Sequence, residues 1–244
     1  MDRLISIKTG KSVYKDDSLV FKVFYSDDIF AFEEAFKQSL ARSLGVVVPF
    51  VKGVETVSEN YAMVSDYIKG KSLLTLLRNG EIGQRQAIEI LAKAQNDVNE
   101  KQTDKLISDR EYFSKGIARS DLDENCKQKA LKKLSELSGK SFLCHGNLGL
   151  KDVVVWQQGY FVTGWGRAYS GDYVSDVAIT YVNLVHYCSE DLAQEFLQTA
   201  LGDNEKFNDW LFVCAVALQK QFVCEKQPVL LKIINDYLQG EKND

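Results

Sequence analysis

The chain has 244 residues, of which 45% are hydrophobic, so it is long enough to form one large domain or two smaller lobes around a packed core. Its formal net charge is −4 and its isoelectric point is about 5.4. These values exclude the strongly basic surface that neutralises nucleic-acid phosphates or anionic lipids, so neither nucleic acid nor a membrane is expected as a partner.

The cysteines and the apolar segments indicate the compartment. Five cysteines are widely spaced in apolar segments without a CxxC pair, which favours reduced thiols in a core: Cys126, Cys144, Cys188, Cys214 and Cys224. Residues 1–11 lack the long apolar run of a signal peptide, and the apolar stretch 211–218 is too short to cross a bilayer. A cytoplasmic protein is therefore expected.

The first quarter of the chain predicts a small sheet and a helix. Segments 4–7, 12–15 and 19–25 are rich in β-branched and aromatic residues, as in strands, and Gly10 lies in the first turn between them. A helix follows, because apolar residues recur every three or four positions until Gly45: Ile29, Phe32, Phe36, Leu40 and Leu44. Segments 53–57 and 61–67 alternate again and complete five antiparallel strands.

After about residue 68 the hydrophobic period becomes helical. Helices are predicted around residues 73–77, 87–98, 122–137, 173–188, 189–201, 205–223 and 228–238. The third of these is expected to begin with Asp121 and Glu124 in capping-box spacing. The sequence therefore predicts an α+β protein with a β lobe over residues 1–68 and a helical lobe over residues 69–244.

The stretch 142–176 has the strongest functional pattern, FLCHGNLGLKDVVVWQQGYFVTGWGRAYSGDYVSD. A short strand at 142–144 enters a polar loop, which leads into a hairpin formed by 153–156 and 160–163. Asn147 and Asp152 stand at the ends of this loop with four residues between them, the spacing of the two polar residues in the kinase catalytic loop HRDxxxxN. Loops held by strands commonly carry chemistry.

This stretch resembles the aminoglycoside phosphotransferase and choline kinase branch of the protein-kinase-like superfamily, whose loop reads HGDLHPGN, followed by a hairpin, V-I-D-W and G-D-P-x-x-D-L-A. The chain keeps the frame of that pattern: His145, Gly146, Leu148, Val162, Trp165, Gly171, Asp172, Asp176 and Ala178. Three chemical positions differ. Asn147 stands where the family has its catalytic aspartate, Asp152 where it has a metal-binding asparagine, and Gly164 where it has a metal-binding aspartate. The resemblance implies a two-lobed kinase-like fold.

The resemblance also implies a phosphate-gripping lysine. Lys22 would grip the nucleotide phosphates and pair with Glu34 on the next helix, with Glu33 as the second choice. Gly10 would lie in the phosphate-covering turn, although a single glycine is also explained by an ordinary hairpin turn. The residues alone equally allow Lys22 to be a half-buried strand lysine and the glutamates to be solvated, with Glu33 paired to Lys37.

A hinge-like segment follows at residues 64–73, VSDYIKGKSL, which resembles the family's M-E-Y-I-x-G-x-x-L. In the family, adenine hydrogen-bonds to the main chain here, which implies the carbonyl of Ser65 and the amide of Tyr67. The plainer interpretation is a strand end joined to a helix that is capped by Ser72.

Two further candidates, His145 and Asp176, are assigned structural roles. The resemblance implies that His145 braces the loop and that Asp176 holds the loop backbone. Asp172 is suited to capping the helix that follows it.

The changed residues argue against ordinary phosphoryl transfer, which depends on positioning and on metal ions that neutralise charge. Asn147 cannot accept a proton from an attacking hydroxyl, and Gly164 offers no side-chain ligand. Asp152 could hold one Mg²⁺, but one carboxylate rarely makes a catalytic metal site. Three hypotheses remain: a pseudokinase that keeps the kinase frame without turnover, with ATP or a protein partner as its candidate ligand; a small-molecule phosphotransferase that uses Asp152 as metal ligand; and a non-catalytic protein-interaction module with an occluded cleft. The substrate is not identified by the sequence.

Overall fold

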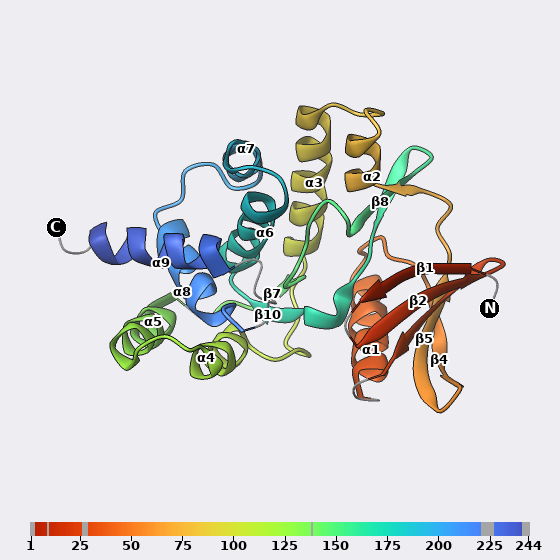
Figure 1. The fold of residues 1–244 in the computed structure, drawn as a ribbon, viewed down its shortest axis with the longest axis horizontal. Coiled ribbons are helices and arrows are strands. Elements are labelled where there is room, and N and C mark those ends of the chain that lie inside the picture. The colour runs from red at the N-terminus through yellow and green to blue at the C-terminus, as the bar shows by residue number, and fades with distance from the viewer. Residues whose placement is uncertain (1–2, 9, 26–28, 138, 221–226, 241–244) are drawn as a thin grey trace. The chain divides into compact units, whose positions relative to one another are not determined.

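The computed structural model describes residues 3–8, 10–25, 29–137, 139–220 and 227–240. The chain divides into two compact units, one formed by Met1–Ile82 with Leu150–Ala168 and the other by Gly83–Gly149 with Tyr169–Asp244. The first contains a small antiparallel sheet and the second is mostly helical, so the predicted α+β class is confirmed (Figure 1).

The first unit is built on a five-stranded sheet with the order β1-β2-β3-β5-β4. Its strands are β1 (Arg3–Lys8), β2 (Lys11–Asp16), β3 (Leu19–Phe24), β4 (Val51–Val57) and β5 (Asn60–Asp66). All neighbouring pairs are antiparallel, and β3 pairs with β5 so that Lys22 faces Met63. The predicted five strands and their turns are confirmed to within two residues at each end.

Helix α1 (Ile29–Ser43) packs against this sheet, but with a different face from the one its apolar period indicates. Ile29, Phe32 and Phe36 are about half exposed, whereas Leu40 is buried together with small and polar residues: Ala31, Glu34, Ala35, Gln38 and Ala41. Ala31 and Ala35 lie against Phe24 and Met63 of the sheet. The apolar period therefore predicted the helix correctly, but its buried face consists mainly of other residues, because a close helix–sheet approach selects small residues and Glu34 is buried as half of an ion pair.

The rest of the first unit comes from two distant segments. Strand β6 (Lys71–Ser72) pairs with β8 (Val153–Trp156), which pairs with β9 (Gly159–Val162). Helix α2 (Leu73–Arg78) follows β6, and the short 3-10 helix η1 (Trp165–Arg167) contacts α1. The predicted lobe boundary at residue 68 is corrected accordingly, since these long-range pairings place residues up to 82 and 150–168 in the first unit.

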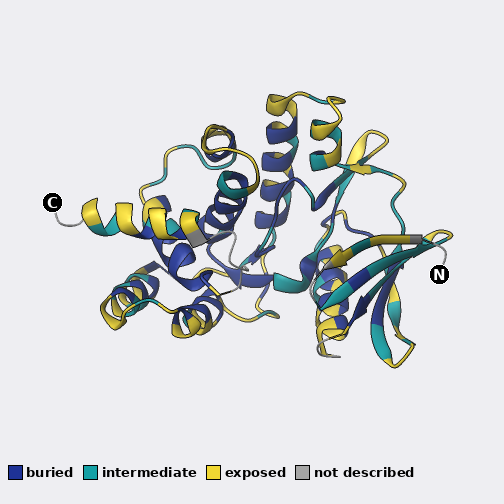
Figure 2. Cartoon of the chain, viewed as in Figure 1, coloured by how far each residue is buried: buried dark blue, intermediate teal, exposed yellow. Residues whose placement is uncertain are grey.

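The second unit contains α3 (Gln84–Asn99), α4 (Asp109–Arg119), α5 (Glu124–Leu137), α6 (Tyr173–Tyr187), α7 (Glu190–Ala200), α8 (Phe207–Ala217) and α9 (Gln227–Gly240), with β7 (Phe142–Cys144) paired to β10 (Tyr169–Gly171). Most residues of α6 and α8 are buried (Figure 2). Its core is therefore centred on these two helices.

The structure corrects two expectations about the helices, the residue that caps α5 and the number of helices before it. Asp123, not Asp121, accepts from the Cys126 amide (3.0 Å) at the start of α5, because it directly precedes the first helical residue. Asp121 instead pairs with Lys220 (2.6 Å). Helix α4 was not predicted, since its sequence is largely charged and contains Gly116.

The predicted core cysteines are confirmed for Cys126, Cys144 and Cys214, which are buried and free, whereas Cys188 is exposed. Cys224 and the predicted helical residues 221–223 lie outside the described residues. Among the described helices, none is both long and apolar enough to span a membrane.

Gly116 on α4 lies against Ala217 at the end of α8, and we expect Gly116→Ala to destabilise the fold. A Cβ there would lie 2.5 Å from the Ala217 carbonyl oxygen. The clash should lower the free energy of unfolding by about 1–3 kcal/mol, outweighing the gain of about 1 kcal/mol that alanine brings to a helix. Urea denaturation measures this, and Gly83→Ala is the control because nothing lies within 4 Å of its Cβ position. Equal stability of the two variants would contradict the tight crossing.

Candidate functional site

The predicted lysine–glutamate pair is present in the first unit. Lys22 on β3 donates to Glu34 Oε1 on α1, and the two form an ion pair. The Glu34 side chain is 2% exposed and that of Lys22 15%, so the pair is shielded from water. Lys11 Nζ lies 3.8 Å from the other Glu34 oxygen. The choice of Glu34 over Glu33 is thus confirmed, since Glu33 is half exposed and lies 3.9 Å from Lys37.

Two further residues near this pair, Lys37 and Gly166, were not identified from the sequence. Lys37 Nζ donates to the main-chain oxygen of Gly166 in η1 (2.9 Å). Burial lowers the pKa of Lys37, and the neighbouring carboxylates of Glu33 and Glu34 oppose that shift. A Cβ on Gly166 would lie 3.1 Å from Glu34 Oε2, so a glycine lets η1 approach the carboxylate closely. The i, i+4 spacing of Glu33 and Lys37 was visible in the sequence, but not this tertiary contact.

The hinge-like segment only partly matches its predicted role. The Tyr67 amide donates to the Ser18 carbonyl (2.7 Å), so it is engaged within the sheet. Ser65 is the second-to-last residue of β5 and pairs with both Val20 and Val51. The Ile68 amide makes no hydrogen bond to another described residue. The prediction that Tyr67 supplies the adenine donor conflicts with this hydrogen bond of its amide.

Gly10 closes the β1–β2 hairpin. It has a φ of 76°, and its carbonyl oxygen accepts from the Tyr25 amide (2.8 Å). These features suit an ordinary tight turn, and the role of Gly10 in covering phosphates stays a prediction.

Asp152 and Gly164 lie near the base of the β8–β9 hairpin. Asp152 is 8% exposed, and its main-chain oxygen accepts from the Thr163 amide (2.8 Å) and hydroxyl (3.1 Å). Gly164 follows Thr163 with a φ of 89° and a ψ of 42°, in the left-handed region. No cluster of three potential metal-binding side chains occurs within the described ranges. Asp152 with a glycine beside it does not fit a two-ligand Mg²⁺ site of the kind that the resemblance implies.

Asp176 is the centre of a buried network in the second unit. Its Oδ2 accepts from the His145 amide (2.8 Å) and its Oδ1 from the Gly146 amide (2.8 Å). Two amide side chains on α3 add hydrogen bonds to Oδ2, from Gln95 (2.7 Å) and Asn99 (3.0 Å). Asp176 and His145 are both fully buried. The predicted role of Asp176 in holding the loop backbone is confirmed.

Asn147 follows this anchored segment and is half buried. Its Oδ1 lies 3.5 Å from the side-chain nitrogen of Asn183 on α6, which also donates to the Leu148 carbonyl (2.8 Å). Asn183 was not singled out from the sequence, because its partner is 36 residues away. Asn147 belongs to the second unit and Asp152 to the first, so their joint action stays a prediction.

The helix-capping prediction for Asp172 is confirmed, since its Oδ1 accepts from the Val174 amide (3.1 Å). The neighbouring Cys144 is fully buried, and burial raises the pKa of its thiol well above the usual value, with the Asp176 carboxylate adding to the shift. Cys144 is therefore a neutral packing residue and not a thiolate nucleophile.

Solved structures of other proteins share this fold. The chain is similar to a thermostable mutant of aminoglycoside phosphotransferase APH(4)-Ia in ternary complex with AMP-PNP and hygromycin B, with a TM-score of 0.72 and 15% identity over 97% of this chain and 92% of that one. The chain has the fold of the aminoglycoside phosphotransferases. No family model and no curated protein matches its sequence.

Two further phosphotransferase-like structures support the same assignment of fold. Amicoumacin kinase hAmiN, in complex with AMP-PNP, Ca²⁺ and Ami, has a TM-score of 0.65 and 14% identity over 96% of this chain and 87% of that one. APH(3'')-Id from Streptomyces rimosus, in complex with ADP and streptomycin, has a TM-score of 0.62 and 14% identity over 88% of this chain and 92% of that one. The predicted kinase-like fold is confirmed.

Proposed function

We propose that this aminoglycoside phosphotransferase-like chain is a pseudokinase that binds ATP with little or no phosphotransfer. The observation that carries the proposal is the assembled Lys22–Glu34 ion pair in a unit where Gly164 supplies no metal-binding carboxylate. A half-buried lysine that is already held by a carboxylate is oriented to bind phosphate without further rearrangement.

The first unit offers contacts for both ends of a nucleotide. Lys22 would hold the phosphates, with Lys11 adding positive charge near Glu34. The Ile68 amide would donate to adenine in place of Tyr67, while the Ser65 carbonyl stays the proposed acceptor. Bound adenine nucleotides or analogues in the similar phosphotransferases support this assignment.

The chemistry of the remaining residues favours loss of catalysis. An amide at position 147 cannot serve as general base, and loss of such a base typically costs a factor of about 10²–10⁴ in rate. Without a carboxylate at position 164, phosphate charge in the transition state is less well neutralised. Binding depends on Lys22 and main-chain groups, so it can persist where turnover does not.

We expect ATP to stabilise the protein and Mg²⁺ to add little. A ligand at about ten times its dissociation constant contributes about 1.4 kcal/mol, or about 3–6 °C in melting temperature for a chain of this size. Thermal-shift assays with ATP, with and without Mg²⁺, measure this. Lys22→Ala should abolish the shift, whereas Lys132→Ala, a change at an exposed lysine on α5, should leave it intact. Absence of a shift in the unaltered protein at millimolar ATP would favour the interaction module instead.

A second candidate is an active small-molecule phosphotransferase in which Asp152 binds the metal. The buried carboxylate of Asp152 beside the hairpin favours it. ATP turnover that is lost on Asp152→Ala would replace the pseudokinase proposal with this one.

A further inference from the structure

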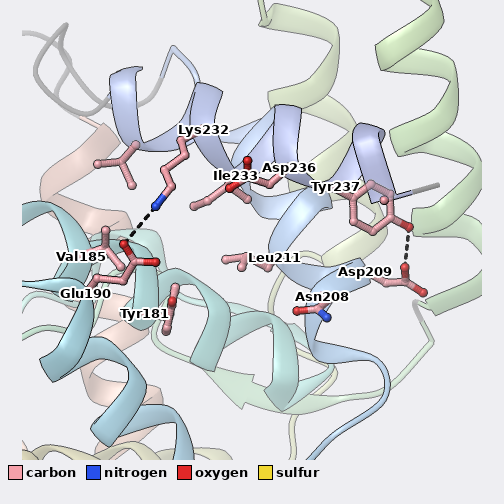
Figure 3. A pocket seen from close by; sticks show the side chains of 12 residues that line it. Tyr181, Val185, Glu190, Asn208, Asp209, Leu211, Lys232, Ile233, Asp236 and Tyr237 are labelled. Carbon is pink, nitrogen blue, oxygen red and sulfur yellow. Dashed lines mark hydrogen bonds and ion pairs between the residues drawn. The ribbon is translucent and has the colours of Figure 1, made fainter. Parts of the chain in front are cut away.

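A pocket of about 540 Å³ lies in the second unit, between α9 and the helices α6 and α8 (Figure 3). Four aliphatic side chains line it: Val185, Leu211, Val229 and Ile233. Tyr181 and Tyr237 add aromatic surface. This volume and the mixture of apolar walls with a few polar groups are typical of sites that bind small organic molecules.

Helix α9 is held over the pocket by specific contacts. Lys232 pairs with Glu190 at one end (3.0 Å), and the Tyr237 hydroxyl donates to Asp209 at the other (2.5 Å) (Figure 3). The Tyr237 ring also stacks on Phe212, with centroids 4.3 Å apart. Leu230 and Ile234 of α9 are fully buried. The pocket therefore has defined walls on both sides.

The charged groups that line the pocket are mostly acidic, namely Glu190, Asp209 and Asp236 against Lys232. Glu190 is paired with Lys232, and Asp209 is paired with Lys133 (3.2 Å) outside the pocket lining. Asp236 makes no ion pair or hydrogen bond to any other described residue, and the charge that acts on it is that of Lys232, one turn earlier on α9. Burial raises the pKa of Tyr181, and the Glu190 carboxylate adds to the shift, so its phenol stays neutral. One carboxylate thus remains for a positive ligand group.

We propose that this pocket binds a small organic cation, with an ammonium group at Asp236 and an apolar body against the aliphatic and aromatic walls. An anion would meet excess negative charge, and a neutral molecule would gain no charge–charge attraction from Asp236, which is exposed to solvent and lies one turn from Lys232. The size of the pocket suits a body of one aromatic ring and a short alkyl chain.

This site is distinct from the loop that carries Asn147. Tyr181 and Val185 lie one turn apart on α6 and line the pocket, whereas Asn183 contacts Asn147 and Leu148. Residues two positions apart on a helix point about 200° apart, so the pocket and the loop lie against opposite faces of α6. The proposal therefore does not depend on the proposed nucleotide site.

The test compares three ligands with the same body: 4-phenylbutylamine, 4-phenylbutan-1-ol and 4-phenylbutanoate. By isothermal titration calorimetry we expect the amine to bind one site with a dissociation constant on the order of 1 mM, about fivefold tighter than the alcohol, with the carboxylate weakest. Asp236→Asn should remove most of the preference for the amine and leave the alcohol unchanged. Asp203→Asn, at an exposed loop residue outside the pocket, is the matched control and should behave like the unaltered protein.

A second variant tests the apolar walls. Ile233→Trp should fill the pocket and weaken binding of both the amine and the alcohol by about tenfold. Asp236 is exposed, so Asp236→Asn is expected to fold normally even if the tryptophan variant does not. Equal affinities for the three ligands, no saturable amine binding at about 10 mM, or amine binding that Asp236→Asn leaves unchanged would each overturn the proposal.

Discussion

Asp176→Ala is expected to lower the free energy of unfolding by about 4 kcal/mol or more, the largest stability effect that we predict. The carboxylate accepts hydrogen bonds from two main-chain amides of the loop, at His145 and Gly146, and from the side chains of Gln95 and Asn99. The Asp176 side chain and its partners His145, Gln95 and Asn99 are all buried. Removing the carboxylate leaves several buried donors without an acceptor, and each such donor costs about 1–3 kcal/mol.

Urea denaturation followed by circular dichroism measures this effect, with Glu195→Ala as the control because Glu195 is an exposed acid on α7. The control should change stability by less than about 0.5 kcal/mol. If Asp176→Ala unfolds at nearly the same urea concentration as the control, the network does not hold the loop as inferred.

The largest expected effect on activity is the appearance of ATP turnover in the triple variant Asn147→Asp, Asp152→Asn and Gly164→Asp. We expect no revival from Asn147→Asp alone, because proton acceptance and charge neutralisation act on the same transition state and their losses multiply. With all three changes the rate should rise at least about 10²-fold over the unaltered protein. Aminoglycosides, choline-like amines and small sugars form the substrate panel.

The structure places limits on this rescue. Aspartate at position 164 must adopt the left-handed backbone that Gly164 now has, which aspartate tolerates better than most residues at a cost of about 1–2 kcal/mol. Asn183 can donate to a carboxylate at position 147 as it does to the present amide oxygen. The melting temperature of each variant must therefore be recorded with its rate. Turnover from Asn147→Asp alone would show that the changed residues at 152 and 164 are no obstacle.

Local features of the chain were readable from the sequence. The alternation of the first 67 residues predicted five strands, and the spacing around 142–163 predicted a strand, a loop and a hairpin, because strand and helix periods are properties of neighbouring residues. The cap at Asp172 and the pairing of Lys22 with Glu34 were also foreseen, the second through the resemblance to phosphotransferases.

Only the tertiary structure decided how these parts are used. It buried the alanine face of α1 and exposed Phe32 and Phe36, because packing distance to the sheet outweighs the apolar content of a helix face. It also engaged the Tyr67 amide with Ser18 and assigned residues 150–168 to the first unit. The four-donor network at Asp176 and the pocket beneath α9 join residues that are far apart in the chain, and no local period or spacing encodes such contacts.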